Sequence, residues 1–124
     1  MLGFTGEDQV FVPGVETSRT RGDFLAVVAN DKSAHLLNMF DGLKTSLPIE
    51  RVVAPSGTDA GELSHLSDHG SFWATGFPAL LVTDTALLRN PHYHRSTDLP
   101  ATLDYTFLKE SAEAVLQALR RFTT

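Results

Sequence analysis

The sequence of 124 residues predicts an α/β fold, a small, mostly parallel or mixed sheet of about three or four strands flanked by helices. Residues 24–29 form a continuous apolar run of strand length, which suits a strand buried on both faces. A segment with helical spacing and a second strand candidate follow, and strand, helix, strand is the βαβ pattern. We therefore expect residues 1–124 to fold as a single domain.

The first predicted helix lies between the strand at residues 24–29 and a strand candidate at residues 49–54. Asn30 and Asp31 end the first strand and can start this helix, and Gly42 lies near its stop. Apolar residues recur at the spacing of one helical face, namely Leu36, Leu37, Phe40 and Leu43.

A polar segment at residues 55–66 is rich in Gly, Ser and Thr, and a loop of this length in a compact domain is typically functional or mobile. A short helix over residues 69–75 should follow it. Asp68 or Ser67 can cap that helix, and Gly76 can end it.

The last two elements are a strand candidate at residues 78–84 and a long amphipathic helix near the end of the chain. Asp104 is the expected cap of this helix, and Arg120 and Arg121 lie in its last turn, where cations suit the helix dipole. Its predicted apolar face consists of Leu108, Ala112, Val115, Leu119 and Phe122.

Composition excludes several classes of function. The formal charge of −5 argues against a nucleic-acid-binding or anionic-membrane surface. We expect a soluble protein, because no apolar run approaches the length that spans a bilayer and no basic-then-apolar signal segment opens the chain. The compartment is left open. The absence of cysteine excludes disulfides, so a metal site would use His, Asp and Glu.

Residues 90–98 (NPHYHRSTD) place two imidazoles, a phenol and a carboxylate directly after the third strand candidate. Sites in open α/β sheets usually form just beyond the carboxyl ends of strands. Pro91 keeps the preceding residue out of helical geometry. If the segment is extended, His92 and His94 point to the same side, because side chains alternate along a strand.

Several motifs around this segment occur together in one family. SDHGSF at residues 67–72, GFPAL at 76–80 and NPHYH at 90–94, with Asp98 after them, resemble the C-terminal half of a zinc aminopeptidase of the M28 peptidase family. The family pattern is roughly Ser-Asp-His-x-x-Phe, Gly-(Ile or Val)-Pro-Ala and Tyr-His-x-x-x-Asp. The resemblance implies a partial aminopeptidase-like fold, with His94 as a zinc ligand.

The resemblance also suggests roles around His94. Asp98 is near enough in sequence to orient its ring, as a carboxylate often does for a metal-bound histidine. Asp68 either caps the following helix or faces the metal centre, with His69 beside it. Tyr93 either hydrogen-bonds substrate or a reaction oxyanion, or packs. For His92 we expect a surface or packing role.

The family's ligand set is incomplete in these residues. Family members hold two zinc ions with a His-x-Asp pair, a Glu-Glu pair, a further Asp and the final His, and one Glu is the general base. The chain contains neither His-x-Asp nor Glu-Glu, and its opening MLGF resembles the segment that follows the further Asp. Asp98-Leu99 also departs from the family's frequent Asp-Thr. The resemblance therefore covers about the C-terminal half of a catalytic domain.

The resemblance implies a zinc-dependent aminopeptidase that hydrolyses peptide bonds, here its C-terminal portion only and inactive alone, because one histidine cannot hold a catalytic zinc. One alternative is a non-catalytic interaction module that kept the fold. Another is a small metal-binding protein that uses His94 with His92, Asp98 or Asp68. We also expect self-association through an exposed strand edge and apolar face.

Overall fold

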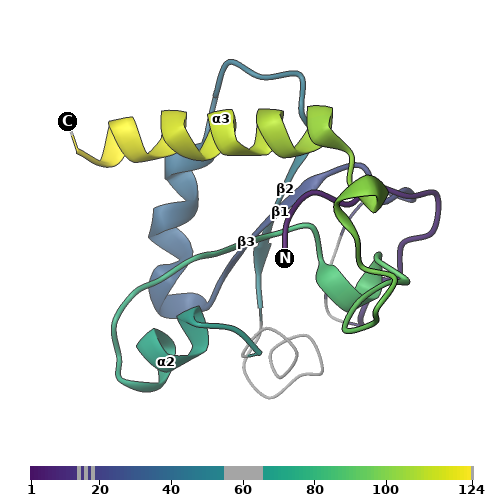
Figure 1. Ribbon diagram of the computed structural model, residues 1–124. Coiled ribbons are helices and arrows are strands. Elements are labelled where there is room, and N and C mark those ends of the chain that lie inside the picture. Colours follow the sequence, from purple (N-terminus) through teal and green to yellow (C-terminus); the bar gives the residue numbers. More distant parts are fainter. Residues whose placement is uncertain (14, 16, 18, 55–65, 124) are drawn as a thin grey trace.

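A computed structural model describes most of the chain, and Figure 1 shows it as a ribbon. The residues that it describes are 1–13, 15, 17, 19–54 and 66–123. The polar segment predicted at 55–66 lies outside them except for Leu66. In chain order, the helices and strands are β1 (Leu25–Ala29), η1 (Asp31–Phe40), β2 (Ile49–Val53), α2 (His69–Ala74), β3 (Leu81–Thr83), η2 (Ala86–Leu88), η3 (Pro100–Thr102) and α3 (Tyr105–Phe122).

The three described strands form one mixed sheet in the order β2-β1-β3. β1 and β2 are parallel and are joined by η1, whereas β3 runs antiparallel to β1. This arrangement confirms the predicted α/β class. The third strand is shorter than predicted because Ala79 makes other hydrogen bonds: its N–H donates to Ser33 Oγ (3.0 Å), and its carbonyl accepts from Trp73 Nε1 (2.9 Å).

The antiparallel direction of β3 changes where the next loop begins. Thr83 pairs with Ala26, and Leu81 pairs with Val28, so β3 ends beside the start of β1. The loop that follows β3 therefore starts at the amino-terminal side of β1 and β2. Residues 90–98 do follow the end of β3, as predicted, but the rule that sites form at the carboxyl ends of parallel strands does not apply here, because β3 is antiparallel to β1.

The helices η1 and α3 cover one face of the sheet. In Figure 1, α3 lies at one end of the molecule, α2 lies at the other, and η1 runs between them. Two adjoining clusters of buried side chains fill the space between these helices and the strands. Their fully or nearly fully buried members are Leu25, Val27, Ala29, Leu37, Phe40, Leu47, Phe107, Ala114 and Ala118.

The helix caps agree with the sequence more closely than the helix faces do. Asn30 accepts the Ser33 N–H through its side chain and starts η1, which is a 3₁₀ helix over its whole length. Asp104 likewise accepts the Phe107 N–H and starts α3. The predicted apolar face of α3 was partly wrong, however. Val115 packs against the core as predicted, but Leu119 and Phe122 are exposed, and the buried residues of the helix are Phe107, Ser111, Ala114 and Ala118.

Helix α2 begins as predicted after Asp68 and is followed by Gly76, which has a left-handed φ of 85°. The side chain of Asp68 makes no capping hydrogen bond, because Asp68 itself has helical backbone angles. Its predicted capping role was therefore wrong. Among the described residues, no helix combines the length and the apolar character needed to cross a membrane.

Candidate functional site

The loop between β3 and α3 is fixed at its start by a buried carboxylate. Asp84 is 1% exposed, and it accepts hydrogen bonds from the N–H groups of Phe4 and Ala86, each at 3.0 Å. These bonds hold a turn in which Thr85 and Ala86 have positive φ, 71° and 46°. Asp84 thus has the turn role that a polar residue at the end of a strand usually has.

Arg89 holds the same region from the inside. Its guanidinium donates to the Phe24 carbonyl (2.8 Å), the Phe4 carbonyl (3.2 Å) and Gln9 Oε1 (2.8 Å). It also lies 4.6 Å from the centre of the Phe24 ring. Burial lowers the pKa of Arg89 to about 10, although the charges of Asp84 and Asp23 act in the opposite direction. The side chain remains a cation at neutral pH.

Glycine is required beside this cation. A Cβ added to Gly22 would lie 2.7 Å from Arg89 Cγ and 2.8 Å from Cδ and Nε. Gly22 also forms an antiparallel bridge with Gly6, with both hydrogen bonds at 2.9 Å. The N-terminal segment, the approach to β1 and the loop after β3 are therefore tied together around one guanidinium.

Asn90 starts the predicted site segment and is 2% exposed. Its Oδ1 accepts the His92 N–H at 2.8 Å, and its carbonyl accepts the Tyr93 N–H at 3.2 Å. Further turns follow, in which Arg95 N–H donates to the His92 carbonyl (3.0 Å) and Asp98 N–H to the Arg95 carbonyl (3.1 Å). The segment is a series of turns, so the alternation expected of an extended chain does not apply.

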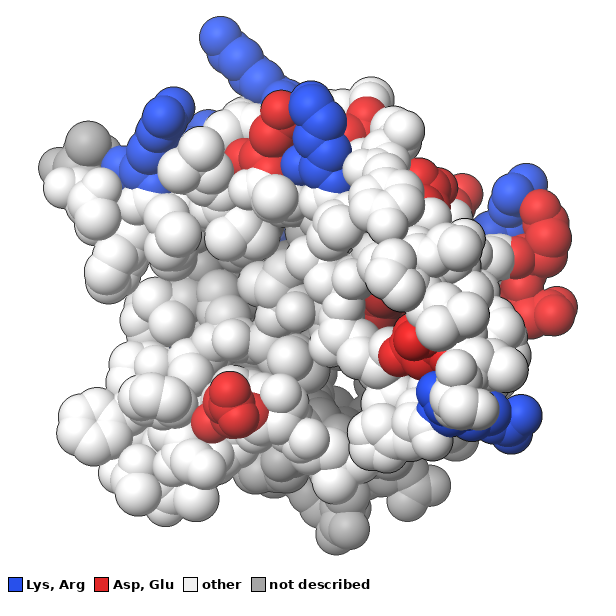
Figure 2. Space-filling view, in the orientation of Figure 1, with Lys and Arg blue, Asp and Glu red and all other residues white. Residues whose placement is uncertain are grey.

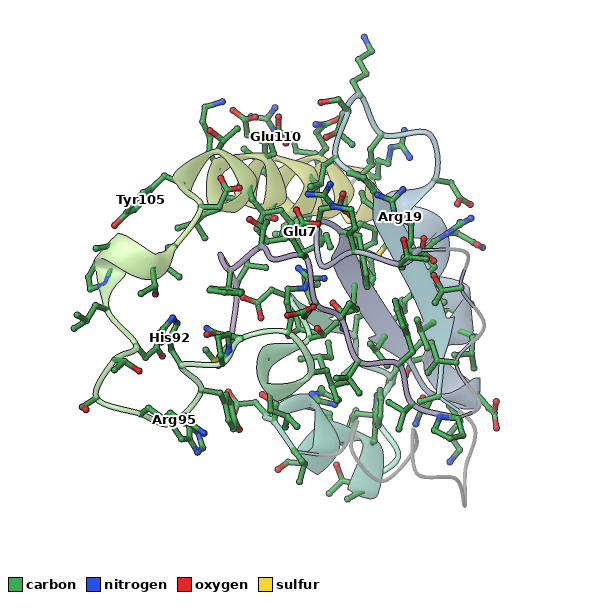
Figure 3. The ribbon with its side chains drawn as sticks, turned by 90° about the vertical axis from the view of Figure 1, so that its right-hand side faces the viewer. Glu7, Arg19, His92, Arg95, Tyr105 and Glu110 are labelled. Atoms are coloured by element: carbon green, nitrogen blue, oxygen red, sulfur yellow. The ribbon has the colours of Figure 1, made fainter. Side chains whose placement is uncertain are left out.

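His92 and His94 consequently face different surroundings. His92 Nδ1 lies 2.9 Å from Thr97 Oγ1, and its ring meets the Phe4 ring edge to face at 6.1 Å. His92 therefore packs within the loop. Figure 3 shows Arg95 pointing outward from the same loop.

His94 is exposed and has a left-handed φ of 55°. Its ring stacks on Tyr93 with a centroid separation of 3.9 Å and an interplanar angle of 15°. Among the described residues, no hydrogen bond or ion pair joins the Asp98 side chain to His94, and both side chains are exposed. Within the described part of the chain, no contact therefore supports the predicted role of Asp98 in orienting the His94 ring.

His69 reaches the same region from α2. It is 5% exposed and meets the Trp73 ring edge to face at 4.5 Å. His69, Tyr93 and His94 all line one hollow of about 330 Å³, whereas the exposed Asp68 does not line it. The structure thus brings together three of the five predicted site residues, from two segments more than twenty residues apart along the chain.

The predicted ligand-type residues do not make a complete metal site. Within the described ranges, no group of three His, Asp or Glu side chains is arranged to hold a metal ion. A catalytic zinc usually needs three protein ligands and an open water position. The described residues therefore do not fit such an ion by themselves, and this weakens the hypothesis of a small metal-binding protein built from His94, His92, Asp98 or Asp68.

Sequence reasoning missed Arg89, which forms the buried base of the site loop together with Asn90, the first residue of the predicted segment. Arg89 lies between the apolar Leu88 and the Asn90-Pro91 pair, a pattern that resembles an ordinary turn. No local pattern distinguishes a buried arginine from an exposed one, because its partners come from residues 65 to 85 positions away.

Comparisons with known proteins agree with the motifs. Residues 6–119 match the family model of Peptidase family M28. The uncharacterized protein YfbL of Escherichia coli (strain K12) is 28% identical over 99 residues. These residues are 80% of this chain and 31% of YfbL, so the chain spans about a third of its relative's length. No solved structure matches significantly.

Proposed function

Since this chain belongs to peptidase family M28, we propose that it is the C-terminal portion of a zinc-dependent aminopeptidase and that His94 is one of the zinc ligands. Family membership itself assigns a metallopeptidase-like kind of function, a hydrolase of peptide bonds. The family is generally zinc-dependent. Our proposal adds three finer statements: that the metal is zinc, that the enzyme releases the N-terminal amino acid of a peptide, and that His94 is a zinc ligand.

One observation supports the role of His94 most directly. Its ring is exposed at the border of the hollow, while the loop beneath it is held by Asp84, Arg89 and Asn90. A metal ligand needs an accessible ring nitrogen on a backbone that does not move. His92 does not line the hollow, and its ring packs against Phe4 within the loop.

The neighbouring residues would position and bind rather than react. Tyr93 stacks on His94 and fixes the orientation of its ring, and its hydroxyl would meet a substrate in the hollow. His69 lines the hollow from the opposite segment. When bound, zinc would act as a Lewis acid on the peptide carbonyl. The general base and the remaining ligands would come from residues that these 124 do not include.

The nucleotide sequence upstream of the Met1 codon tests this proposal. In-frame His-x-Asp and Glu-Glu codons would support a zinc aminopeptidase of which this chain is one portion. The purified 124-residue chain should then release no amino acid from aminoacyl-nitroanilides, and the extended chain should do so only with His94 intact. Zinc-dependent release by the short chain, abolished in His94→Ala, would contradict the proposal that it is inactive alone.

A non-catalytic interaction module is the second candidate. The hollow supports it, because its floor is one whole face of the sheet and is mostly apolar. An upstream sequence without the two motifs would favour this module over the enzyme.

A further inference from the structure

The two faces of the sheet have different surroundings. Side chains alternate along a strand, so neighbouring residues of β1 point to opposite faces. Leu25, Val27 and Ala29 pack beneath η1 and α3. Ala26 and Val28 instead line the hollow of about 330 Å³.

We call this second face the bare face. It comprises the sheet residues that line the hollow, namely Ala26, Val28, Glu50, Val52, Leu81 and Thr83. Among the described residues, η1 is the helix with the main contacts to β1 and β2. It lies on the face of the sheet opposite to the bare face. Apolar side chains at the rim are also solvent-exposed: Val10 60%, Leu66 68% and Leu87 47%.

An apolar face of this kind needs a covering layer. β1 is apolar on both faces and pairs in parallel with β2, and parallel strands are normally buried on both sides by helices. Figure 2 shows charged side chains gathered over α3 and along the right-hand side of the molecule, and fewer on the rest of the face in view. The N-terminal segment covers part of the bare face, where Phe11 stacks on Phe24 at 6.3 Å. Val28, Val52 and Leu81 remain only half-buried.

The bare face carries one charge, the carboxylate of Glu50. Its register partner is Ala26, and within the described residues no side chain forms an ion pair with Glu50. By contrast, Arg51 points to the opposite side and is paired with Asp41. A carboxylate on an apolar surface is costly to bury unless its partner brings a cation or donor.

We propose that the bare face binds an amphipathic α-helix that carries a basic side chain opposite Glu50. The helix would belong to polypeptide outside these 124 residues, of the kind that makes up the other two thirds of YfbL, since the match covers only 31% of that relative. A second helix layer would complete the α/β arrangement that η1 and α3 begin. The inference does not require His94 to bind zinc.

The chain contains no cysteine, which allows single-cysteine labelling. The variants are Val28→Cys on the bare face, Val27→Cys on the covered face as a folding control, and Ser71→Cys at an exposed position of α2. The probe is the part of YfbL outside the 99 matched residues, added to the full 124-residue chain. Maleimide labelling is measured as a function of probe concentration, and co-elution in gel filtration reports binding.

The expected result is co-elution, with protection of Val28→Cys while Ser71→Cys stays reactive and Val27→Cys stays protected throughout. Adding Glu50→Gln should raise the probe concentration for half-protection about tenfold, because a charge-assisted hydrogen bond is lost. Glu110→Gln, on α3, should leave that concentration unchanged.

Three results would overturn the proposal. The first is no binding of the probe. The second is binding that leaves Val28→Cys reactive or is indifferent to Glu50→Gln. The third is protection of Val28→Cys that depends on the concentration of the chain alone, which would identify a second copy of the chain as the occupant.

Discussion

The two ends of the loop between β3 and α3 differ sharply from its middle. At one end Asp84 accepts the Phe4 N–H, and at the other Asp104 accepts from Thr5 Oγ1 at 2.9 Å, while its own N–H donates to the Gly3 carbonyl at 2.8 Å. Both ends are thus tied to the same short N-terminal segment. The middle, residues 94–100, is exposed throughout.

This difference shows how an exposed ligand can sit on a fixed base. Both ends are held by hydrogen bonds, and the first also contains a buried cation, so their residues should determine stability. The exposed middle carries His94 and has few contacts beyond the loop, so its residues should affect binding without affecting stability. Substitutions in the two regions can therefore separate the two properties, and three variants test this from the largest effect to the smallest.

Arg89→Met should have the largest effect. It removes the buried guanidinium and leaves the Phe4 and Phe24 carbonyls without its hydrogen bonds and Asp84 without the nearby charge. Breaking a buried charged network in this way typically costs about 3–5 kcal/mol of unfolding free energy. Urea denaturation followed by circular dichroism measures it.

Arg95→Met is the matched control, since Arg95 is exposed in the middle of the loop. Its unfolding free energy should stay within about 0.5 kcal/mol of the parent. Equal losses for the two variants would contradict the distinction between anchored ends and exposed middle.

Asp104 should produce a smaller, pH-dependent effect. The hydrogen bond from Phe107 N–H, joined by those from Thr5 and Thr106, keeps the pKa of Asp104 below its usual value. A carboxylate with a lowered pKa in the folded state stabilises fully above its unfolded pKa, and this stability is lost as the pH falls through the folded pKa. We therefore expect the contribution of Asp104 to disappear in acid, below the usual pKa range of a carboxyl group.

Asp104→Asn isolates this contribution, because asparagine also caps helices but does not titrate. Between neutral and strongly acidic pH, the parent should lose about 1 kcal/mol more unfolding free energy than Asp104→Asn. This value is within the usual range for a helix cap and allows for solvent screening at a partly exposed site. Parallel stability curves for both proteins over this range would argue against the cap.

His94→Ala should have the smallest effect on stability. The residue is exposed and stacks on Tyr93, so the unfolding free energy should change by about 0.5 kcal/mol or less. The parent should bind zinc weakly and His94→Ala more weakly still, whereas His92→Ala should bind as the parent does.

Elemental analysis after gel filtration and zinc titration measure zinc binding by the parent, His94→Ala and His92→Ala. Stoichiometric zinc that stays bound to the parent through gel filtration would show that the chain builds a complete site, against our expectation. Equal zinc affinity in His94→Ala would remove His94 from the ligand set.

Local pattern was enough for much of the fold. The unbroken apolar run before Asn30 predicted β1, the Asn30 and Asp104 caps were predicted at the correct residues, and the motif order predicted the M28 family. These features depend on neighbours within a few positions, where backbone propensity and side-chain capping act directly.

Tertiary structure decided the rest. The antiparallel direction of β3, the face of α3 that meets the sheet and the burial of Arg89 all depend on contacts between residues far apart in sequence. The same holds for the hollow that brings His69 to the side of His94. The sequence by itself determined which residues have the chemistry of a site. Packing decided which of them meet, because which partners a side chain finds depends on the assembled layers rather than on its neighbours in the chain.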